Sequence, residues 1–421
     1  MSILIRNVLH ENKKVDVYIE GNRFKHIGPD LAIPAETVLE GHNKAILPSF
    51  HNGHTHAAMT LLRGYADDME LHTWLNDHIW PLEAALTEDD VYVGSKLACL
   101  EMIKSGTTFF NDMYWHFDST ARAAQEMGMR AAISSVFIDF FDKEVAQKRW
   151  EDCRQLFDKN QDLNSRIQFA LGPHAIYSVS KESLIKVKEF AEYYDLVIHI
   201  HLSESKREVH DAMECFGQTP VEYLDSLELL GPNLCCCHAL WLTEKEMDLL
   251  AEHDVKVIHN PVSNLKLCSG RFPYEQYLQR QIKIGLGTDG CSSNNNLDML
   301  EEMKFATLAA KDFYSNPTLM PATEIFQTAT SNGAEIFGLE TGYIEEGRLA
   351  DCILVDLTHP QLVPNHNLIS NLVYSANGDC VSTTICNGKI LMDNRQVQGE
   401  KEIIRQAQET ANSLIDKKSI N

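Results

Sequence analysis

Short apolar runs typical of β-strands recur through the middle of the chain. Longer stretches with helical spacing separate them, such as residues 88–104 and 181–194. The eight runs are 45–50, 107–110, 131–133, 167–171, 196–201, 234–238, 255–259 and 282–286. Strands that alternate with helices favour a parallel sheet. Eight such units in about 240 residues are typical of a (β/α)₈ barrel. The sequence therefore predicts an α/β fold built on a TIM-like barrel.

The two ends of the chain share a different pattern, in which short apolar runs are separated by turn residues. Residues 3–5 and 15–19 show it near the start, and residues 350–355 and 383–391 show it near the end. We expect these segments to pair into one small β-sandwich domain. It would comprise residues 1–47 and 346–421 and include a helix near its end, and the barrel domain would span residues 48–345.

Polar residues stand where several of the predicted barrel strands end. In barrel enzymes the active residues lie at the carboxyl ends of the strands, so this placement predicts a catalytic site. The polar residues at these positions are His54, His56, His174, His201, Glu204, His238 and Asp289.

Four of these residues form a candidate metal site. His54 and His56 are two positions apart, so an extended chain directs both imidazoles to the same side. His201 and Asp289 would approach the same point from across the barrel mouth. Three nitrogens and one carboxylate suit Zn²⁺ with one position left for water, and Fe²⁺ and Mn²⁺ stay open as alternatives. Without a shared ligand, so many buried polar groups would be costly.

Charge and composition restrict the class of ligand. The chain has 421 residues, a formal net charge of −23 and 11 cysteines without a disulfide-type spacing. This acidity disfavours nucleic acids and anionic membranes and favours a small neutral or cationic ligand. No apolar run reaches the ~18 residues of a membrane helix, and the start of the chain lacks a signal-peptide pattern. We therefore expect a cytoplasmic protein with reduced thiols and, by base rate, a homo-oligomer such as a dimer or tetramer.

Several conspicuous residues have simpler structural interpretations. His199 lies deeper on the same strand face as His201 and is more typical of a hydrogen-bonded core histidine than of a ligand. His51 has the same interpretation. Residues 235–237, three consecutive cysteines, indicate a buried strand. Trp74 by default is a packing residue.

Together these motifs resemble the amidohydrolase superfamily, and within it the deaminases of S-adenosylhomocysteine and 5′-methylthioadenosine. The resemblance covers nearly the whole chain. The residues that carry it are 48–56 (PSFHNGHTH), 61–64 (LLRG), 80–83 (WPLE), 172–174 (GPH), 201–204 (HLSE), 259–264 (HNPVSN), 287–290 (GTDG) and 347–351 (GRLAD). The resemblance implies hydrolytic removal of the amino group from an adenosine-type nucleoside, with release of ammonia.

The resemblance also implies roles for individual residues. His54, His56, His201 and Asp289 would hold a single metal ion, because no lysine ends the fourth strand. His238 and Asp289 would orient the attacking water and take its proton. Glu204 would donate a proton to the purine ring.

Other residues would bind the substrate. Glu83 would accept hydrogen bonds from the ribose hydroxyls, and His174 would make a second contact. Trp74 and Ser293 are weaker candidates for the pocket wall. Ser135 stands where carboxylate-recognising relatives carry arginine, so 5′-methylthioadenosine, adenosine or 5′-deoxyadenosine is favoured over S-adenosylhomocysteine, unless Arg149 or a neighbouring lysine supplies the charge.

Two alternatives stay open at this point. A related hydrolase could act on another amino- or chloro-heterocycle at the same site, although Glu83 favours a substrate with a ribose. A non-catalytic metal-binding protein would have no use for Glu204 and His238, which bind no metal in this scheme.

Overall fold

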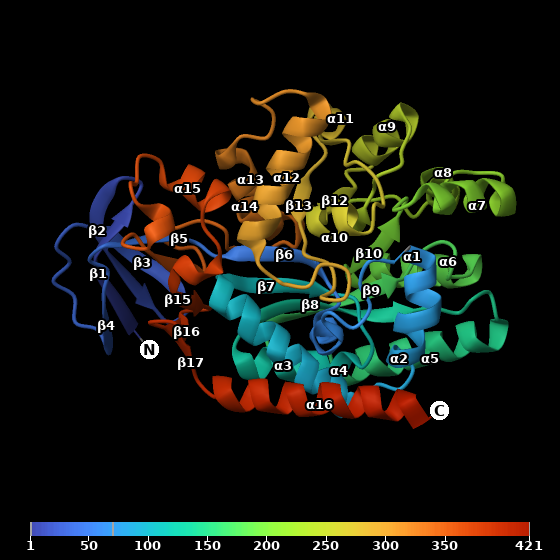
Figure 1. The fold of residues 1–421 in the computed structure, drawn as a ribbon, viewed down its shortest axis with the longest axis horizontal. Helices are drawn as coiled ribbons and strands as arrows, with labels where there is room; N and C mark the ends of the chain where they lie inside the picture. Colours follow the sequence, from blue (N-terminus) through green and yellow to red (C-terminus); the bar gives the residue numbers. More distant parts are fainter. Residues whose placement is uncertain (1, 70, 421) are drawn as a thin grey trace.

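The computed structural model describes residues 2–69 and 71–420. Eight parallel strands form a nearly closed barrel within these residues, with helices on its outside (Figure 1). The strands are β6 (Phe50–Thr55), β7 (Thr107–Asp112), β8 (Arg130–Phe137), β9 (Ile167–Pro173), β10 (Val197–Leu202), β11 (Leu234–His238), β12 (Lys256–His259) and β13 (Ile284–Leu286). The predicted barrel is confirmed.

Helices connect successive barrel strands, and their ends follow local capping rules. Thr87 and Asp90 form a capping box at the start of α3, and Gly106 ends the same helix in a left-handed conformation. The barrel helices are α3 (Glu88–Ser105), α4 (Phe117–Met127), α5 (Lys143–Lys159), α6 (Lys181–Tyr194), α7 (Lys206–Phe216), α8 (Pro220–Ser226), α9 (Glu244–Glu252), α10 (Pro261–Lys266), α11 (Tyr274–Gln279), α12 (Met299–Tyr314), α13 (Ala322–Ala329) and α14 (Ser331–Ile336).

The connection between β6 and β7 is longer than a barrel unit needs, and it covers one side of the barrel mouth. It contains the short helical elements η1 (Ala57–Leu62), α1 (Leu71–Thr73), η2 (Trp74–Ile79) and α2 (Trp80–Glu83). Of these, η2 is a π-helical turn, a form often found at functional sites. This segment carries Trp74 and Glu83 to the site.

Side chains and one backbone bond close the seam between β6 and β13. The Asn52 amide donates to the Thr288 hydroxyl at 2.7 Å and accepts from the Thr288 backbone N–H at 3.0 Å. The Asp289 backbone N–H donates to the His54 carbonyl at 3.0 Å. The seam thereby brings Asp289 beside the His-x-His segment.

Segments from both ends of the chain form one mixed sheet beside the barrel (Figure 1). In it β5 pairs with β14 and β1, so the two ends meet at its centre. The strands are β1 (Ser2–His10), β2 (Lys13–Glu20), β3 (Arg23–Gly28), β4 (Thr37–Glu40), β5 (Lys44–Pro48), β14 (Cys352–Asp356), β15 (Val381–Cys386), β16 (Lys389–Asp393) and β17 (Gln396–Val397). The predicted pairing of the two ends is confirmed. The domain limits near residues 48 and 346 remain a proposal.

The first predicted barrel strand, residues 45–50, was placed wrongly. Its apolar part belongs to β5 of the terminal sheet, where Leu47 pairs with Ile353 and Ile46 pairs with Leu354. The first barrel strand is instead β6, which contains His54 and is entirely buried. A strand of mostly polar residues is stable here because its side chains find partners within the barrel mouth.

The last helix, α16 (Glu400–Ile420), runs along the barrel (Figure 1). It contacts α3 and η1, and Ala407 and Leu414 share an apolar cluster with residues of η1. It therefore packs on the barrel, although the sequence groups it with the terminal strands. The remaining elements are η3 (Pro360–Leu362), α15 (Leu368–Tyr374) and η4 (Gly378–Cys380).

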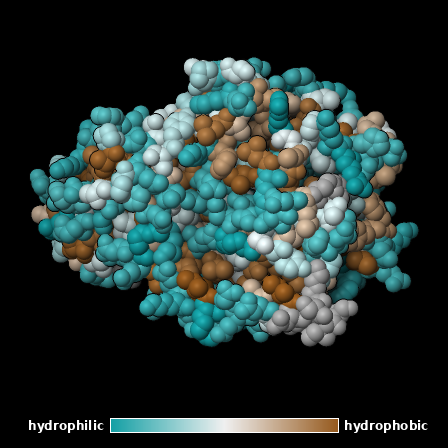
Figure 2. Space-filling model, viewed as in Figure 1, coloured by the Kyte–Doolittle hydropathy of each residue, from teal (hydrophilic) through white to brown (hydrophobic). Residues whose placement is uncertain are grey.

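Polar residues cover most of the molecular face in Figure 2, with apolar residues in smaller groups between them. Within the described chain, every helix is too short or too polar to cross a lipid bilayer.

Candidate active site

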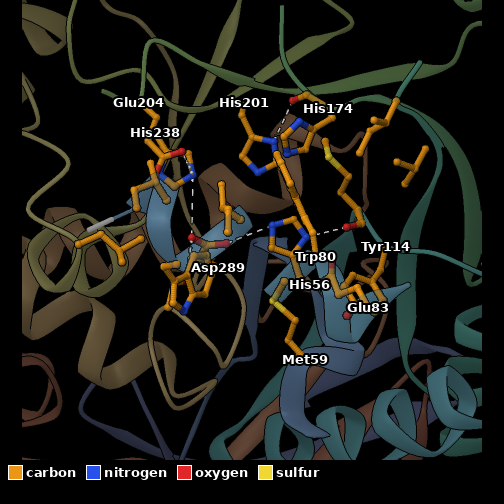
Figure 3. Close-up of a pocket in the computed structure, with 18 of the residues that line it drawn as sticks. His56, Met59, Trp80, Glu83, Tyr114, His174, His201, Glu204, His238 and Asp289 are labelled. Carbon is orange, nitrogen blue, oxygen red and sulfur yellow. Dashed lines mark hydrogen bonds and ion pairs between the residues drawn. The ribbon is translucent and has the colours of Figure 1, made fainter. Parts of the chain in front are cut away.

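The carboxyl ends of the barrel strands open into a cavity. Side chains from different strands point into it toward a common centre (Figure 3). Nearly all the site residues expected from the sequence line this cavity, and His54 lies fully buried beside it. Those that line it are His56, Trp74, Glu83, His174, His201, Glu204, His238, Asp289 and Ser293.

Each of the three candidate metal-binding histidines has a hydrogen-bond partner at its Nδ1 atom. His56 Nδ1 lies 2.6 Å from the Met113 carbonyl oxygen, and His201 Nδ1 lies 2.9 Å from the His174 carbonyl oxygen. Because a carbonyl oxygen only accepts hydrogen bonds, both Nδ1 atoms carry a proton. Neutral His56 and His201 therefore leave Nε2 free as a ligand.

His54 is oriented in the same way by a histidine behind it. His54 Nδ1 lies 2.9 Å from His199 Nε2, which is also 2.9 Å from Cys237 Sγ. Both distances fall within hydrogen-bond range, and all three side chains are fully buried in the barrel. His199 is therefore a core histidine, as the sequence suggested, but one that fixes a candidate ligand.

Asp289 faces the histidines with one oxygen and two serines with the other. Its Oδ1 lies 3.2 Å from His54 Nε2 and 3.3 Å from His56 Nε2. Its Oδ2 accepts hydrogen bonds from the Ser263 hydroxyl at 2.6 Å and the Ser293 hydroxyl at 3.1 Å. The carboxylate is thus held with a fixed oxygen toward the histidines.

This arrangement fits a bound cation. His54 Nε2 is buried and makes no hydrogen bond to any described residue, a cost that a metal ligand bond would remove. Ring nitrogens of His54, His56 and His201 lie within 4.8 Å of one another. These atoms and Asp289 supply the nitrogen and oxygen donors typical of zinc sites.

The electrostatics of the cluster also favour a positive charge between Asp289 and the histidines. Burial lowers the pKa of His54 to about 4 and that of His201 well below its usual range, so both imidazoles are neutral at neutral pH. Burial also acts to lower the pKa of His56, but the Asp289 carboxylate outweighs it and raises that pKa to about 9. Asp289 thus favours a cation here, either a proton on His56 or a metal ion.

Two candidate proton-transfer groups lie beside this cluster. His238 Nε2 is 3.9 Å from Glu204 Oε2 and 4.0 Å from Asp289 Oδ2. Ser269 donates a hydrogen bond to Glu204 Oε1 at 3.2 Å. The imidazole therefore lies between two carboxylates in the wall of the cavity (Figure 3).

The backbone that presents these groups is strained. Ser203, His238 and Asp289 have φ angles of 49°, 69° and 62°, in the left-handed region that non-glycine residues seldom adopt. The Glu208 carboxylate accepts the backbone N–H groups of Ser203 and Glu204, both at 2.8 Å. Glu208 thereby stabilises the turn that directs Glu204 into the cavity.

The outer wall of the cavity contains the expected substrate-binding residues. Burial raises the pKa of Glu83, against the opposing influence of Tyr114 and Trp115. Burial lowers the pKa of His174 to about 3, and its Nδ1 lies 2.8 Å from the Ser178 hydroxyl. Trp74 lines the cavity and donates its indole N–H to the Ala66 carbonyl at 3.0 Å. It also packs in a buried apolar cluster, as the sequence suggested.

Comparisons with known proteins agree with this geometry. The model of the amidohydrolase family matches residues 45–391. The chain belongs to this family. It is 46% identical over 427 residues to a 5′-deoxyadenosine deaminase of Methanospirillum hungatei, an alignment that covers 100% of this chain and 95% of the relative. It is 45% identical over 400 residues to 5-methylthioadenosine/S-adenosylhomocysteine deaminase 1 of Archaeoglobus fulgidus, covering 94% of each.

A solved structure supports the same assignment. The chain resembles a zinc-bound adenosine deaminase from Xanthomonas campestris with a TM-score of 0.93 and 32% identity. The match covers 99% of this chain and 98% of the solved one. The family resemblance expected from the sequence is therefore confirmed.

Four residues of this amidohydrolase support the site but have no role in the sequence-based prediction. Ser263 and Asn264 lie in α10, directly after β12, in the segment 259–264 that carries part of the family resemblance. Ser269, in the loop after α10, and Glu208, in the first turn of α7, contact Glu204. The spacing of Glu208, four residues after Glu204, is a local signal that could have identified it, whereas Ser269 has no such signal.

Ser135 does not line the main cavity. It lies in an adjoining pocket with Trp115 and Arg149, and the Arg149 guanidinium carbon is 5.2 Å from the centre of the Trp115 ring. The relation of this position to a substrate carboxylate therefore remains a proposal.

Proposed function

We propose that this amidohydrolase removes the amino group of an adenosine-type nucleoside by hydrolysis, which yields the inosine analogue and ammonia. The observation that carries the proposal is that Glu83 shares one cavity with the His56–His201–Asp289 cluster and with Glu204. A ribose-binding carboxylate and a hydrolytic centre on the same cavity suit a nucleoside better than a bare heterocycle. The deaminase relatives support the same reaction.

His54, His56, His201 and Asp289 would hold one divalent metal ion, with Zn²⁺ favoured by the donor set. When bound, such a metal lowers the pKa of a water molecule and so supplies a nucleophile near neutral pH. The protein residues around it determine where the protons go. The Nδ1 hydrogen bonds of the histidines would keep each Nε2 available as a metal ligand.

His238, Asp289 and Glu204 would move the protons. His238 and Asp289 would take a proton from the attacking water, and Glu204 would protonate the ring nitrogen beside the carbon under attack. The water oxygen would bond to that carbon, which becomes tetrahedral as its double bond to the protonated ring nitrogen becomes a single bond. The proton taken from water would then pass to the amino group, whose bond to the carbon breaks so that ammonia leaves. The new hydroxyl would return a proton to Glu204 as it becomes the carbonyl of the inosine analogue.

The outer wall would hold the sugar. Glu83 would accept hydrogen bonds from the ribose hydroxyls as a carboxylate. His174, which is neutral because its pKa is lowered, would make a second contact. Trp74 and Ser293 would border the site, and Ser293 would also hold Asp289.

A second cavity beside Glu83 points to the preferred 5′ substituent. It shares Trp80, Glu83, Trp115 and Ile138 with the main cavity. Its remaining lining is Ala84, Leu86, His116, Phe140, Val145 and Arg149. Because its walls are mostly apolar, we propose that 5′-deoxyadenosine and 5′-methylthioadenosine are better substrates than S-adenosylhomocysteine.

Ultraviolet absorbance tests the reaction, because conversion of adenine to hypoxanthine changes the spectrum. Zinc-loaded protein would be mixed separately with adenosine, 5′-deoxyadenosine, 5′-methylthioadenosine, S-adenosylhomocysteine and free adenine. Turnover of nucleosides but not adenine supports the proposal. Glu83→Gln should raise KM for nucleosides about tenfold, since hydrogen bonds to a charged group contribute roughly 1.5–3 kcal/mol. Metal-loaded protein that is silent on every nucleoside contradicts the proposal.

A further inference from the structure

A side-chain amide behind the site contacts the imidazole that lies between the two carboxylates. Asn264, in α10, is 3% exposed. Its Oδ1 lies 2.7 Å from His238 Nδ1, the shortest side-chain contact of that ring. An amide oxygen only accepts hydrogen bonds. In this arrangement His238 Nδ1 carries the proton.

The other end of the same amide fixes its orientation. Asn264 Nδ2 lies 3.4 Å from His259 Nδ1, a ring nitrogen that accepts when it has no proton. Burial lowers the pKa of His259 to about 3, so this imidazole is neutral. It also stacks on Phe272 with ring centres 3.9 Å apart and an angle of 13° between the rings. A rigid acceptor on one side therefore directs the amide oxygen toward His238.

A second amide near His238 does not select a ring nitrogen. Asn260 Nδ2 lies 3.4 Å from both His238 Nδ1 and His238 Nε2. Equal distances to both nitrogens give no preference between the two neutral forms of the ring. The choice of tautomer therefore depends on Asn264.

We propose that Asn264 is a positioning residue that keeps neutral His238 in the form with a bare Nε2. That atom faces Glu204 Oε2 and Asp289 Oδ2 at 3.9 and 4.0 Å. Only this tautomer can accept a proton inside the cavity, and the two carboxylates would stabilise the resulting cation. The inference rests on the proposed function, because it names what prepares His238 for the deamination.

Three substitutions test the proposal. Asn264→Leu has a similar size but no acceptor, so kcat should fall on the order of 100-fold, the lower range for loss of a general base. KM and metal content should stay unchanged, because neither Glu83 nor the metal-binding atoms are touched. Asn264→Asp keeps the acceptor and should recover most of the lost kcat. If the leucine variant does not fold, Asn264→Ala removes the acceptor without added bulk and should show the same loss.

A double-mutant cycle shows whether Asn264 acts through His238. In a His238→Gln background, Asn264→Leu should cause no further loss of kcat. Asn371→Leu is the matched control, because Asn371 lies on α15, its amide donates to the Leu362 and Pro364 carbonyls, and it does not line the cavity. It should change thermal stability and leave kcat unaltered.

The outcomes separate this inference from the proposed function. If the wild type turns over nucleosides and Asn264→Leu has a near-native kcat, the inference about Asn264 is overturned and the proposed function stands. The inference is also overturned if Asn264→Asp has a kcat as low as that of Asn264→Leu. It is overturned as well if Asn264→Leu lowers kcat in the His238→Gln background as much as it does in the wild type. An inactive wild-type protein overturns the proposed function itself.

Discussion

The two walls of the cavity are built in different ways. The inner wall consists of strand ends, and its side chains are bound to one another or to backbone, as with Asp289 and its two serines. The outer wall comes from the long connection after β6 and from aromatic and aliphatic side chains such as Trp80 and Ile138. The inner wall suits a fixed reaction, and the outer wall suits a substrate preference that can change without loss of the chemistry. Changes to the inner wall should therefore affect kcat for every nucleoside, and changes to the outer wall should alter their ranking.

Removal of metal should have the largest effect. Chelation should reduce turnover of every nucleoside on the order of 10³-fold or more. The reason is that the pKa of water is about 16 when it is free and about 7 when it is bound to such a metal. Activity and metal content would be measured together, followed by readdition of Zn²⁺, Fe²⁺ or Mn²⁺. Full activity in protein free of metal would contradict the role of the inner wall.

Glu204→Gln should lower kcat for every nucleoside by roughly 10²–10⁴-fold, since proton transfer to the ring would be lost. Metal content and the thermal unfolding midpoint should stay close to those of the wild type. Glu214→Gln, on the exposed surface of α7, is the control for the same chemical change. Near-native turnover by the Glu204 variant would remove this residue from the mechanism.

Glu208 should make folding stability depend on pH. Burial raises its pKa to about 7 from an ordinary value of 4.5, so the folded protein favours the protonated form. This contribution to stability is present below about pH 4.5 and is lost as the pH rises through about 7. At about 1.4 kcal/mol per pKa unit, the loss is roughly 3 kcal/mol.

Urea unfolding of the wild type and Glu208→Gln at pH 5, 6, 7 and 8 measures this contribution. The stability of the wild type relative to the variant should fall as the pH rises. A constant difference between the two proteins across this range would show that Glu208 does not titrate there.

Arg149→Gln should have the smallest effect and alter substrate preference alone. A partly exposed charge pair contributes about 0.2–1 kcal/mol. The variant should therefore lose about two- to fivefold in kcat/KM for S-adenosylhomocysteine and nothing for 5′-deoxyadenosine. Lys148→Gln, one position earlier in α5 and 74% exposed, is the control with the same charge change. An equal loss on both substrates would place Arg149 outside the 5′ pocket.

The barrel and the main site residues were predictable because their signals are local. Each polar residue stands next to an apolar run, as His174 follows β9 and His238 ends β11. The split of residues 45–50 between β5 and β6 was not predictable, since the apolar pattern continues across Ser49. Only the pairing of β5 with β14 shows that the first half belongs to the other sheet.

The sequence alone determined which side chains reach the barrel mouth, because neighbouring residues determine the periodicity of a strand and the position where it ends. The tertiary structure decided which atoms of those side chains face the cavity. The partners that set this, such as His199 behind His54 and Asn264 behind His238, are 145 and 26 residues away in the chain. A hydrogen bond depends on a separation of about 3 Å in space, and no repeat in the sequence encodes that separation.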